Sequence, residues 1–354
     1  MNIGIYSPYL KTLTGGEKYI FTAASCLSSE HKVSIFWDDP GILEMASKKF
    51  DLDLSKVTVV PNIFAKQNSF LKRFISTFKY DRILYLSDGS IPIVACKLLI
   101  HFQFPVEWLN TNSFVFLFRK SRISKIICNS HFTKRFIDKK FNASSFVLYP
   151  PASTNREKLG DKEKLILTVG RFSILPNGTD FKKLAMLVES FKLFQKKRLK
   201  GWKMAIVTSV QDEDLDSYKK FESDIKSSYI TLFRNADHKQ IVDLYKKATI
   251  YWHASGFGED LSKYPERAEH FGISTVEAMS YGQVPVVINA GGQPEIVKDN
   301  ENGFLWSTQE ELIKATHKVA VDHDLFVKIQ QNAIDSSKRF TKERFCEELS
   351  HLIW

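Results

Sequence analysis

The sequence predicts an α/β protein of two doubly wound parallel-sheet domains that face each other across a cleft. Short apolar, β-branched segments alternate with helical segments, a pattern typical of parallel sheets covered by helices on both faces. A polar stretch at residues 153–162 interrupts this alternation once, and a chain of 354 residues is ordinary for two domains. We therefore expect domains at residues 1–156 and 157–340 and a terminal helical segment at 341–354.

The expected elements follow from the position of each apolar segment. In the first half we expect strands at residues 3–7, 32–36, 82–86 and 125–128, and a helix at 17–27. In the second half we expect strands at residues 165–169, 203–207, 229–233 and 250–253, and helices at 181–195 and 241–247. The last helix is expected at about residues 341–352.

A helix start lies within the segment that carries most of the functional signal. Ser274 and Glu277 fit the capping-box pattern, in which Ser is the N-cap and Glu is the third helical residue. We therefore expect a helix from about residue 275 to residue 281, ended by Gly282.

A second helix start follows at once. Residues 284–288 are apolar and mostly β-branched, which indicates a buried parallel strand. A glycine-rich turn ends at Gly292, and Pro294 suits the first turn of a helix. The loop would lie at the carboxyl end of a strand, where open α/β sheets bind their ligands.

The chemistry of this segment suits a ligand that is part diphosphate and part sugar. Backbone N–H groups at helix starts bind phosphates. The carboxylates of Glu269 and Glu277, eight residues apart, can accept hydrogen bonds from sugar hydroxyls. The alternatives are structural: Glu277 would only cap its helix, and Glu295 would only favour the dipole of the next helix.

Other candidate residues lie near expected strand ends. Arg171 comes just after the expected strand 165–169, so its guanidinium should project into the cleft, where it can grip a phosphate with two donors. Gly15 and Gly16 would let the backbone approach a ligand closely. The alternatives are a surface arginine and a plain tight turn.

Composition narrows the class. The chain is 44% hydrophobic and 25% charged, which is typical of a globular protein, and it has no apolar run long enough to cross a bilayer. Its four cysteines are scattered without metal-like spacing, and we expect reduced core residues of a cytosolic protein.

The formal net charge of +10 leaves three interpretations open. Basic residues interleave with aromatic ones at residues 70–75, 119–122 and 134–141. They could form a solvated surface, attach the protein to an anionic membrane, or bind nucleic acid. No nucleic-acid recognition motif is visible, so we expect no nucleic-acid partner.

Taken together, several short motifs resemble one family. Glu269 and Glu277 form a Glu-x7-Glu pair that is followed by Ala-Met-x-x-Gly-x-Pro-Val-Val and Gly-Gly-x-x-Glu-Ile-Val. Further matches are Thr-Gly-Gly-Glu at residues 14–17, Asn-Ser-His-Phe-Thr at 129–133 and Val-Gly-Arg-Phe at 169–172. The chain thus resembles the retaining glycosyltransferases of family 4, which have the GT-B fold of two Rossmann-like domains.

The resemblance implies a reaction. The enzyme would move a hexose from a nucleoside-diphosphate sugar to a hydroxyl of a glycan or lipid-linked glycan, with retention of configuration. Mannose from GDP-mannose is the favoured donor, as in lipid-linked oligosaccharide and polysaccharide mannosyltransferases. No cofactor and no metal are expected. The terminal helix would cross back to the first domain.

The resemblance also assigns residues. Catalytic roles fall to Glu269, Arg171 and His101, the last beside the transferred sugar. Glu277 would hold the ribose, and His253 and His270 are less certain. The family adds a lysine shortly after the arginine, but here residues 173–180 replace that loop, and Lys182 and Lys183 are the candidates, with Lys183 favoured. The donor-binding set is therefore Gly15, Gly16, Arg171, Lys182, Lys183, Glu269, Phe271, Gly272, Ile273 and Glu277.

Two other functions remain open at this point. The departure after Arg171 would permit a catalytically silent GT-B protein that binds a nucleotide sugar, and the net charge would permit a basic nucleic-acid-binding protein. For the transferase we expect a cytoplasmic location, in loose contact with the anionic inner face of a membrane.

Overall fold

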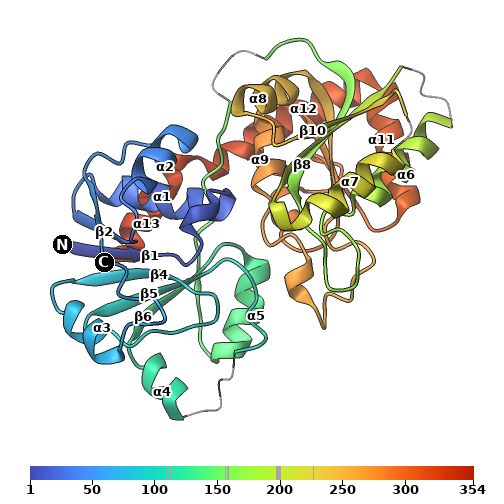
Figure 1. The fold of residues 1–354 in the computed structure, drawn as a ribbon. Helices are drawn as coiled ribbons and strands as arrows, with labels where there is room; N and C mark the ends of the chain where they lie inside the picture. The colour runs from blue at the N-terminus through green and yellow to red at the C-terminus, as the bar shows by residue number, and fades with distance from the viewer. Residues whose placement is uncertain (110, 112–113, 156, 158, 197–200, 226) are drawn as a thin grey trace. The chain divides into compact units, whose positions relative to one another are not determined.

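The computed structural model describes every residue except 110, 112–113, 156, 158, 197–200 and 226. The chain divides into two compact units (Figure 1). The first unit contains Met1–Pro151 and Lys342–Trp354, and the second contains Ala152–Thr341. The boundary residue expected from the sequence, Arg156, lies outside the described residues. Each unit has a parallel sheet with helices on both faces, so the predicted α/β class is confirmed.

Among the described residues of the first unit, seven parallel strands have the order β3-β2-β1-β4-β5-β6-β7. This is the doubly wound order of a Rossmann-like sheet. The strands are β1 (Asn2–Tyr6), β2 (Lys32–Phe36), β3 (Val57–Val60), β4 (Arg82–Leu86), β5 (Lys97–Phe102), β6 (Ile123–Cys128) and β7 (Phe146–Val147).

Helices cover both faces of this sheet (Figure 1). One face packs against α1, α2 and α13 and the other against α3, α4 and α5, and each face has its own apolar cluster. The helices are α1 (Gly15–Leu27), α2 (Ile42–Phe50), α3 (Phe70–Ser76), α4 (Phe114–Lys120), α5 (His131–Phe141) and α13 (Lys342–Ile353), with a 3-10 turn η1 (Leu10–Thr12).

In the described part of the second unit, six parallel strands have the order β10-β9-β8-β11-β12-β13. The order repeats that of the first sheet, and it reverses between β8 and β11. The strands are β8 (Glu163–Phe172), β9 (Lys203–Val210), β10 (Ile230–Arg234), β11 (Ala248–His253), β12 (Val284–Ile288) and β13 (Phe304–Trp306).

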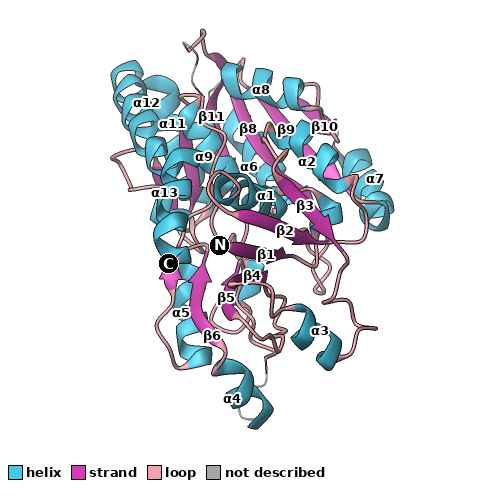
Figure 2. Cartoon of the chain, turned by 90° about the vertical axis from the view of Figure 1, so that its left-hand side faces the viewer, coloured by secondary structure: helices cyan, strands magenta, loops and turns pink. Residues whose placement is uncertain are grey.

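The helices of the second unit also lie on both faces of its sheet (Figure 2). Buried residues of α6, α7 and α11 contribute to a large apolar cluster with the strands. The helices are α6 (Leu184–Lys196), α7 (Leu215–Asp224), α8 (His238–Lys247), α9 (Ile273–Ser280), α10 (Gln293–Ile296), α11 (Gln309–Val321) and α12 (His323–Ser337), with 3-10 turns η2 (Asp212–Asp214), η3 (Pro265–Arg267) and η4 (Lys338–Phe340).

The predicted capping box at the start of α9 is wrong. The helix begins two residues earlier than expected, at Ile273, and its N-cap is Gly272. Gly272 has φ = 120°, which disfavours any residue with a Cβ atom. The sequence pattern of Ser274 and Glu277 was fitted to a cap, but both side chains bond elsewhere. Gly282 follows the end of the helix with φ = 73°, as predicted.

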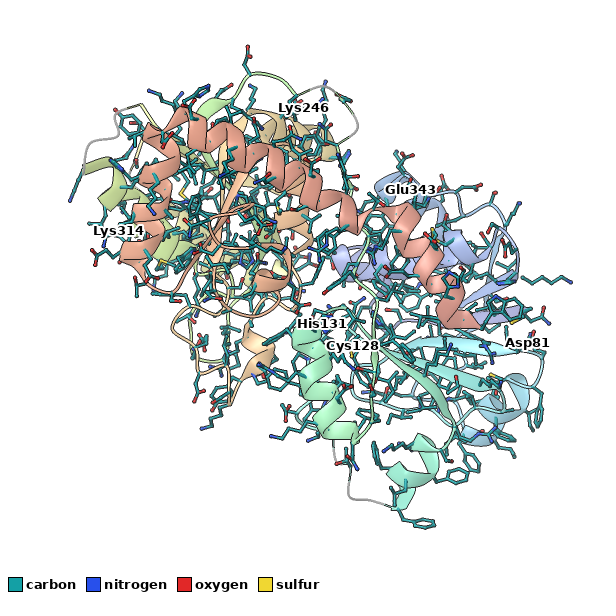
Figure 3. The ribbon with its side chains drawn as sticks, turned by 180° about the vertical axis from the view of Figure 1, so that it is seen from behind. Asp81, Cys128, His131, Lys246, Lys314 and Glu343 are labelled. Atoms are coloured by element: carbon teal, nitrogen blue, oxygen red, sulfur yellow. A yellow bond between two sulfur atoms is a disulfide. The ribbon has the colours of Figure 1, made fainter. Side chains whose placement is uncertain are left out.

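The terminal helix α13 belongs to the first unit, and Figure 3 labels Glu343 near its start. It buries Phe345, Leu349 and Ile353, which recur at every fourth residue and therefore share one face. Arg82 and Lys125 donate hydrogen bonds to carbonyl groups at its end. Packing on one face and capping at the carboxyl end together fix this helix.

A disulfide bond also holds α13. Cys26 on α1 and Cys346 on α13 are bonded, although they are 320 residues apart in the chain. The expectation that the cysteines are reduced is therefore wrong for this pair, because only the folded unit brings the two helices together. Cys96 and Cys128 are free. Because Cys26 and Cys346 are bonded, the cysteines no longer support a cytosolic location.

We predict that the disulfide can be counted and that it stabilises the first unit. Denatured protein should expose two titratable thiols without reductant and four with it. Cys346→Ser should lower the midpoint of thermal unfolding by roughly 5–15 °C, since loss of a native disulfide costs about 2–5 kcal/mol. The matched control is Cys96→Ser, which removes a free thiol. Four titratable thiols without reductant, or equal midpoints for the two variants, would contradict this prediction.

Candidate functional site

The carboxyl ends of β8 and β11 lie where the strand order of the second sheet reverses. In open α/β sheets, ligands bind at this reversal point. Gly170 and Arg171 occupy the end of β8, and His253 is the last residue of β11. The structure therefore places three residues of the sequence analysis at the position where this architecture forms its binding sites.

A carboxylate, a lysine and a histidine meet at this point. Oε2 of Glu269 lies 2.6 Å from Nζ of Lys182 and 2.9 Å from Nε2 of His253. The stem of Lys182 passes over Gly170, where a Cβ atom would come within 2.5 Å of Cε of the lysine. Gly170 before the arginine thus has a local role: it leaves the space through which Lys182 reaches Glu269.

The cluster has a defined charge. Burial would raise the pKa of Glu269, but Lys182 and the hydrogen bond from His253 outweigh it and hold this pKa well below its usual range. Burial lowers the pKa of His253, so the ring is neutral at pH 7. Nε2–H then donates to Glu269, and Nδ1 is buried without a hydrogen-bond partner among the described residues. The site presents an ionised carboxylate between a cation and a neutral imidazole.

The two candidate lysines have different partners. Nζ of Lys183 lies 2.5 Å from Oε1 of Glu259, and both side chains are buried. Arg267 contacts the other oxygen of this carboxylate at 2.8 Å. Lys183 is therefore held inside a structural network, whereas Lys182 contacts Glu269. The phosphate-binding role of either lysine stays a prediction, and these contacts favour Lys182 over Lys183 as the candidate.

The unusual loop after Arg171 is part of that network. Residues 173–181 form a tight turn in which Phe181 N–H donates to the carbonyl of Ser173 at 2.8 Å. Asn177 and Thr179 from this turn both donate hydrogen bonds to Glu259. The buried carboxylate thus ties the turn to the segment that leads into Glu269.

Arg171 lies on β8 and not after it. The strand runs to Phe172, and Arg171 pairs with Ser209 of β9. Its side chain is about half exposed, and its nearest carboxylate is that of Glu213 at 3.9 Å. A long, exposed pair of this kind contributes little to stability. The guanidinium is therefore accessible to a ligand at the strand end.

Glu277 lies on α9 and bonds to two neighbouring segments. Its Oε1 accepts from the N–H of Ser153 and its Oε2 from the hydroxyl of Tyr245, both at 3.3 Å. The ring of Tyr245 stacks on that of Tyr281 with 5.5 Å between centroids. Both of these bonds are longer than a typical N–H···O or O–H···O hydrogen bond.

Glycines hold the loop that carries Glu269. Gly292 N–H donates to the carbonyl of Glu269 at 2.8 Å. A Cβ atom on Gly291 would lie 2.2 Å from that carbonyl oxygen, and one on Gly292 would lie 2.5 Å from the carbonyl oxygen of His270. The glycine turn was predicted to offer N–H groups to a phosphate, yet the structure shows that Gly292 uses its N–H to position Glu269.

The remaining residues of this segment are structural neighbours of the cluster. Phe271 is buried, and its ring lies 5.3 Å from that of Phe340. Gly272 and Ile273 form the start of α9. Burial lowers the pKa of His270 to about 4, so this ring is also neutral at pH 7.

The predicted residues of the first unit lie close together within that unit. Gly15 and Gly16 begin α1, and the carboxylate of Glu17 accepts from the N–H of Thr14 at 2.7 Å. A Cβ atom on Gly16 would lie 2.5 Å from Oε1 of Gln103. The glycine therefore permits close packing of α1 against the loop after β5.

His101 is fully buried on β5. Its ring stacks on Tyr19 with 4.2 Å between centroids, and its Nδ1 lies 3.2 Å from the carbonyl oxygen of Ile127. Burial lowers its pKa to about 3, so the ring is neutral. With the side chain inside the core of the first unit, its contact with a transferred sugar stays a prediction.

The described residues lack two kinds of feature. They contain no group of three or more His, Cys, Asp or Glu side chains arranged to hold a metal ion. They also contain no helix with the length and apolar character needed to span a bilayer.

The chain matches a known family over residues 151–336, described as "Glycosyl transferases group 1". The matched segment is more than half of the chain and contains the whole Lys182, Glu269 and His253 cluster. The chain belongs to the glycosyl transferases group 1 family. The match begins one residue before the second unit and ends at residue 336, within α12.

Curated relatives of this group 1 chain are mannosyltransferases. It is 26% identical over 224 residues to the GDP-Man:Man(3)GlcNAc(2)-PP-Dol alpha-1,2-mannosyltransferase of Dictyostelium discoideum, covering 59% of this chain and 42% of that protein. It is 26% identical over 280 residues to human alpha-1,3/1,6-mannosyltransferase ALG2, covering 63% of each. The chain thus spans less than two thirds of the length of these curated relatives.

Solved structures show the same fold. Anabaena HepE in complex with UDP has a TM-score of 0.74 and 18% identity, covering 100% of this chain and 99% of that chain. A glycosyltransferase from Rickettsia africae has a TM-score of 0.73 and 17% identity, covering 99% and 97%. The GT-B fold expected from the sequence is confirmed.

The sequence did not assign a role to His253 or to Glu259. His253 was uncertain, although its place at the end of an expected strand was a usable signal. Glu259 gave no signal, because Lys183 lies 76 residues away in the chain. Glu269 and Glu259 contact Lys182 and Lys183 of one dipeptide, and only folding separates the two pairs.

We predict that Glu259→Gln destabilises the group 1 chain in a pH-dependent way. Burial would raise the pKa of Glu259, but Lys183, Arg267 and Asn177 outweigh it and lower the pKa to about 2, against an ordinary value of 4.5. A lowered carboxyl pKa stabilises the fold above the unfolded-state value, and this stability is lost as the pH falls toward the folded-state value. The variant should be less stable at pH 7.

The difference between the parent and Glu259→Gln should shrink by about 1.4 kcal/mol between pH 7 and pH 3.5, measured by thermal unfolding. Glu310→Gln is the matched control, because it removes an exposed carboxylate paired with Lys314 at 3.1 Å. A difference that stays constant over this range would contradict the assigned pKa of Glu259.

Proposed function

We propose that this chain is a retaining glycosyltransferase that transfers a hexose from a nucleoside-diphosphate sugar to a hydroxyl of a glycan or lipid-linked glycan. The observation that carries the proposal is the Lys182, Glu269 and His253 cluster at the reversal point of the second sheet. Membership of the group 1 family supports it. The cluster combines a cation for a phosphate with a carboxylate for sugar hydroxyls.

The first task of the reaction is to stabilise the departing diphosphate. Lys182 lies at the binding edge of the sheet, and Arg171 has an accessible guanidinium on the adjoining strand end. Positive groups aimed at the developing charge lower the barrier most where water is excluded. We propose that Lys182 exchanges Glu269 for the diphosphate when the donor binds, and that the N-terminus of α9 adds its partial charge.

The second task is to hold the sugar as its anomeric carbon becomes cationic. Glu269 is ionised and has lost Lys182 at this stage, so it can accept from sugar hydroxyls and stabilise positive charge nearby. His253 keeps the carboxylate oriented through its Nε2–H. Among the described residues, the ion-pair and hydrogen-bond partners of the Glu269 carboxylate are a lysine and a neutral histidine, not a second carboxylate as in a retaining glycosidase. We therefore propose a front-face reaction in which a diphosphate oxygen takes the proton of the acceptor.

Mannose from GDP-mannose is the donor we propose. The support comes from relatives described as a GDP-Man-dependent alpha-1,2-mannosyltransferase and as alpha-1,3/1,6-mannosyltransferases. Lys182 and Arg171 supply the positive charge that a divalent metal would otherwise supply, so we propose a metal-independent reaction. Activity should then persist in a chelator.

A thermal-shift panel of UDP, GDP, ADP and their hexoses tests the donor, because a ligand that binds only the native state stabilises it. Stabilisation by GDP and GDP-mannose is expected. Release of GDP with transfer to a dolichol-type or oligosaccharide acceptor then tests the activity, and proton NMR of the product tests retention. Donor binding without hydrolysis or transfer would favour the catalytically silent alternative.

We also propose a peripheral position on a membrane surface for the working enzyme. The support is the distribution of basic and aromatic side chains over the first unit, together with a relative described as acting on a dolichol-linked substrate. We also propose that the enzyme lies on the cytoplasmic inner face of the membrane. The cysteines do not support this location, because Cys26 and Cys346 form a disulfide bond.

We predict that Glu277→Ala weakens GDP binding by about tenfold or more, since two ribose hydroxyls lose a charged acceptor and each such hydrogen bond contributes about 1.5–3 kcal/mol. Tyr245→Phe is the matched control: it removes the hydroxyl that bonds Glu277 at 3.3 Å and leaves the carboxylate. Calorimetry on both folded variants is the measurement. Unchanged affinity in Glu277→Ala would remove the ribose assignment.

We predict that Lys182→Met lowers kcat by about 100-fold, because it deletes one cation aimed at the diphosphate. Lys183→Met should instead lower the midpoint, since it leaves the buried Glu259 without one of its cations. Initial rates and thermal unfolding of the two variants separate these effects. Lost turnover at the parent midpoint in Lys183→Met would reverse the roles of the two lysines.

A further inference from the structure

The helix α3 and the turn after it expose their large apolar side chains. Phe70 is 64% exposed and Phe78 is 68% exposed, and Leu71 and Ile75 are also exposed. None of the residues of α3 is buried. Leu71, Ile75 and Phe78 recur at helical spacing and therefore share one side. A helix of a soluble protein normally turns such a side toward the core.

The helix α4 repeats this arrangement. Phe114 is 85% exposed, and Leu117 and Phe118 are exposed at the i+3 and i+4 positions. Phe116 points the other way and is buried, with 5.4 Å between its ring and that of Phe141. The helix is thus anchored to the core by one aromatic ring while a second apolar stripe faces outward.

Both helices lie on one face of the first sheet. In Figures 1 and 2, α3 and α4 lie on the side opposite α1 and at the same end of the first unit. The core contacts agree: Arg73 of α3 lies over the ring of Phe64, and Phe64 and Phe116 belong to the same apolar cluster. We name the exposed residues of α3 and α4 the α3–α4 surface; it consists of Phe70, Leu71, Ile75, Phe78, Phe114, Leu117 and Phe118.

The chain segments that carry the α3–α4 surface are rich in basic residues, although the acidic residues Asp81, Glu107 and Asp138 directly adjoin them. Residues 62–80 contain four basic side chains and no acidic one, and residues 108–137 contain six basic side chains and no acidic one. The whole chain, in contrast, has 40 acidic against 50 basic residues. Lys66, Lys72 and Lys79 are exposed beside α3. The segments that expose aromatic rings are therefore also the segments from which carboxylates are absent.

This combination fits an anionic lipid surface. Phe and Leu side chains enter the boundary between headgroups and acyl chains, and basic side chains stay at the headgroup level. Carboxylates would be repelled there by the negative surface potential of the anionic lipids. We propose that the α3–α4 surface docks the first unit on an anionic bilayer. The inference goes beyond the proposed transfer reaction and does not require it, and it names the face of the first unit that would meet the membrane.

Co-sedimentation of the full chain with vesicles tests this proposal. Phosphatidylcholine vesicles with and without phosphatidylglycerol are compared at low and high salt, without nucleotide sugar, so that the result is independent of turnover. We expect binding to the anionic vesicles that weakens with salt. Equal binding to neutral vesicles, or no binding to either kind, would overturn the proposal.

Variants locate the contact. Phe118→Ser should weaken binding by at least about tenfold, because it removes one aromatic side chain from the interface. Lys72→Gln should weaken it by about fivefold, the expected effect of one charge near an anionic surface. Met45→Ser and Lys48→Gln are the matched controls, since they alter exposed residues of α2 on the opposite face of the same sheet. Equal losses in both pairs would overturn the assignment to the α3–α4 surface.

Other occupants of this surface give distinct outcomes. A second copy of the chain would appear as a dimer in sedimentation velocity that Phe118→Ser dissociates. A nucleic acid would appear as a mobility shift of a random-sequence RNA that Lys72→Gln weakens and Phe118→Ser does not. Either result, with no vesicle binding by the parent chain, contradicts the proposal. All four side chains are exposed, so circular dichroism should show the parent fold in each variant.

Discussion

The ion pair between Lys182 and Glu269 is the interaction on which the candidate site depends. It joins the loop after β8 to the segment before α9, and a distance of 2.6 Å makes it a charge-assisted hydrogen bond. Gly170 leaves the space for the lysine stem, and Gly291 and Gly292 pack against the backbone of Glu269. These glycines therefore allow the Lys182 side chain and the neighbouring backbone to pack closely. This close packing fixes the position of the Glu269 carboxylate.

A second buried carboxylate supports the first. Glu259 binds Lys183 and Arg267 and accepts from the turn at residues 173–181. The two neighbouring lysines thus bind different glutamates. Lys182 binds Glu269 in the candidate site, and Lys183 binds Glu259 in the network that holds the turn at residues 173–181. Because an unpaired buried charge is costly, each lysine has its own glutamate partner in this structure. Lys182 therefore lies at the reversal point of the sheet, while Lys183 helps to hold the turn at residues 173–181.

The first unit combines a fixed core with an exposed apolar surface. The disulfide between Cys26 and Cys346 and the buried stripe of α13 close one face of its sheet. The opposite face carries α3 and α4, which expose large apolar side chains and belong to segments rich in basic residues. One face of the sheet is therefore covered by helices that a disulfide bond holds together. The helices on the other face expose an apolar surface of the kind that could contact lipid.

The sequence by itself determined the architecture, and it predicted the segment in which the candidate site lies. Apolar runs placed β2 and β4 at their observed bounds, and the β-branched run at Val284–Ile288 gave β12, because local periodicity controls these elements. Tertiary structure decided the partners. It bonded Ser274 to Tyr251 in place of a cap, buried His101 against Tyr19, assigned Lys182 and Lys183 to different carboxylates, and joined two cysteines 320 residues apart. Contacts between residues so distant in the chain depend on packing geometry, which local sequence patterns do not encode.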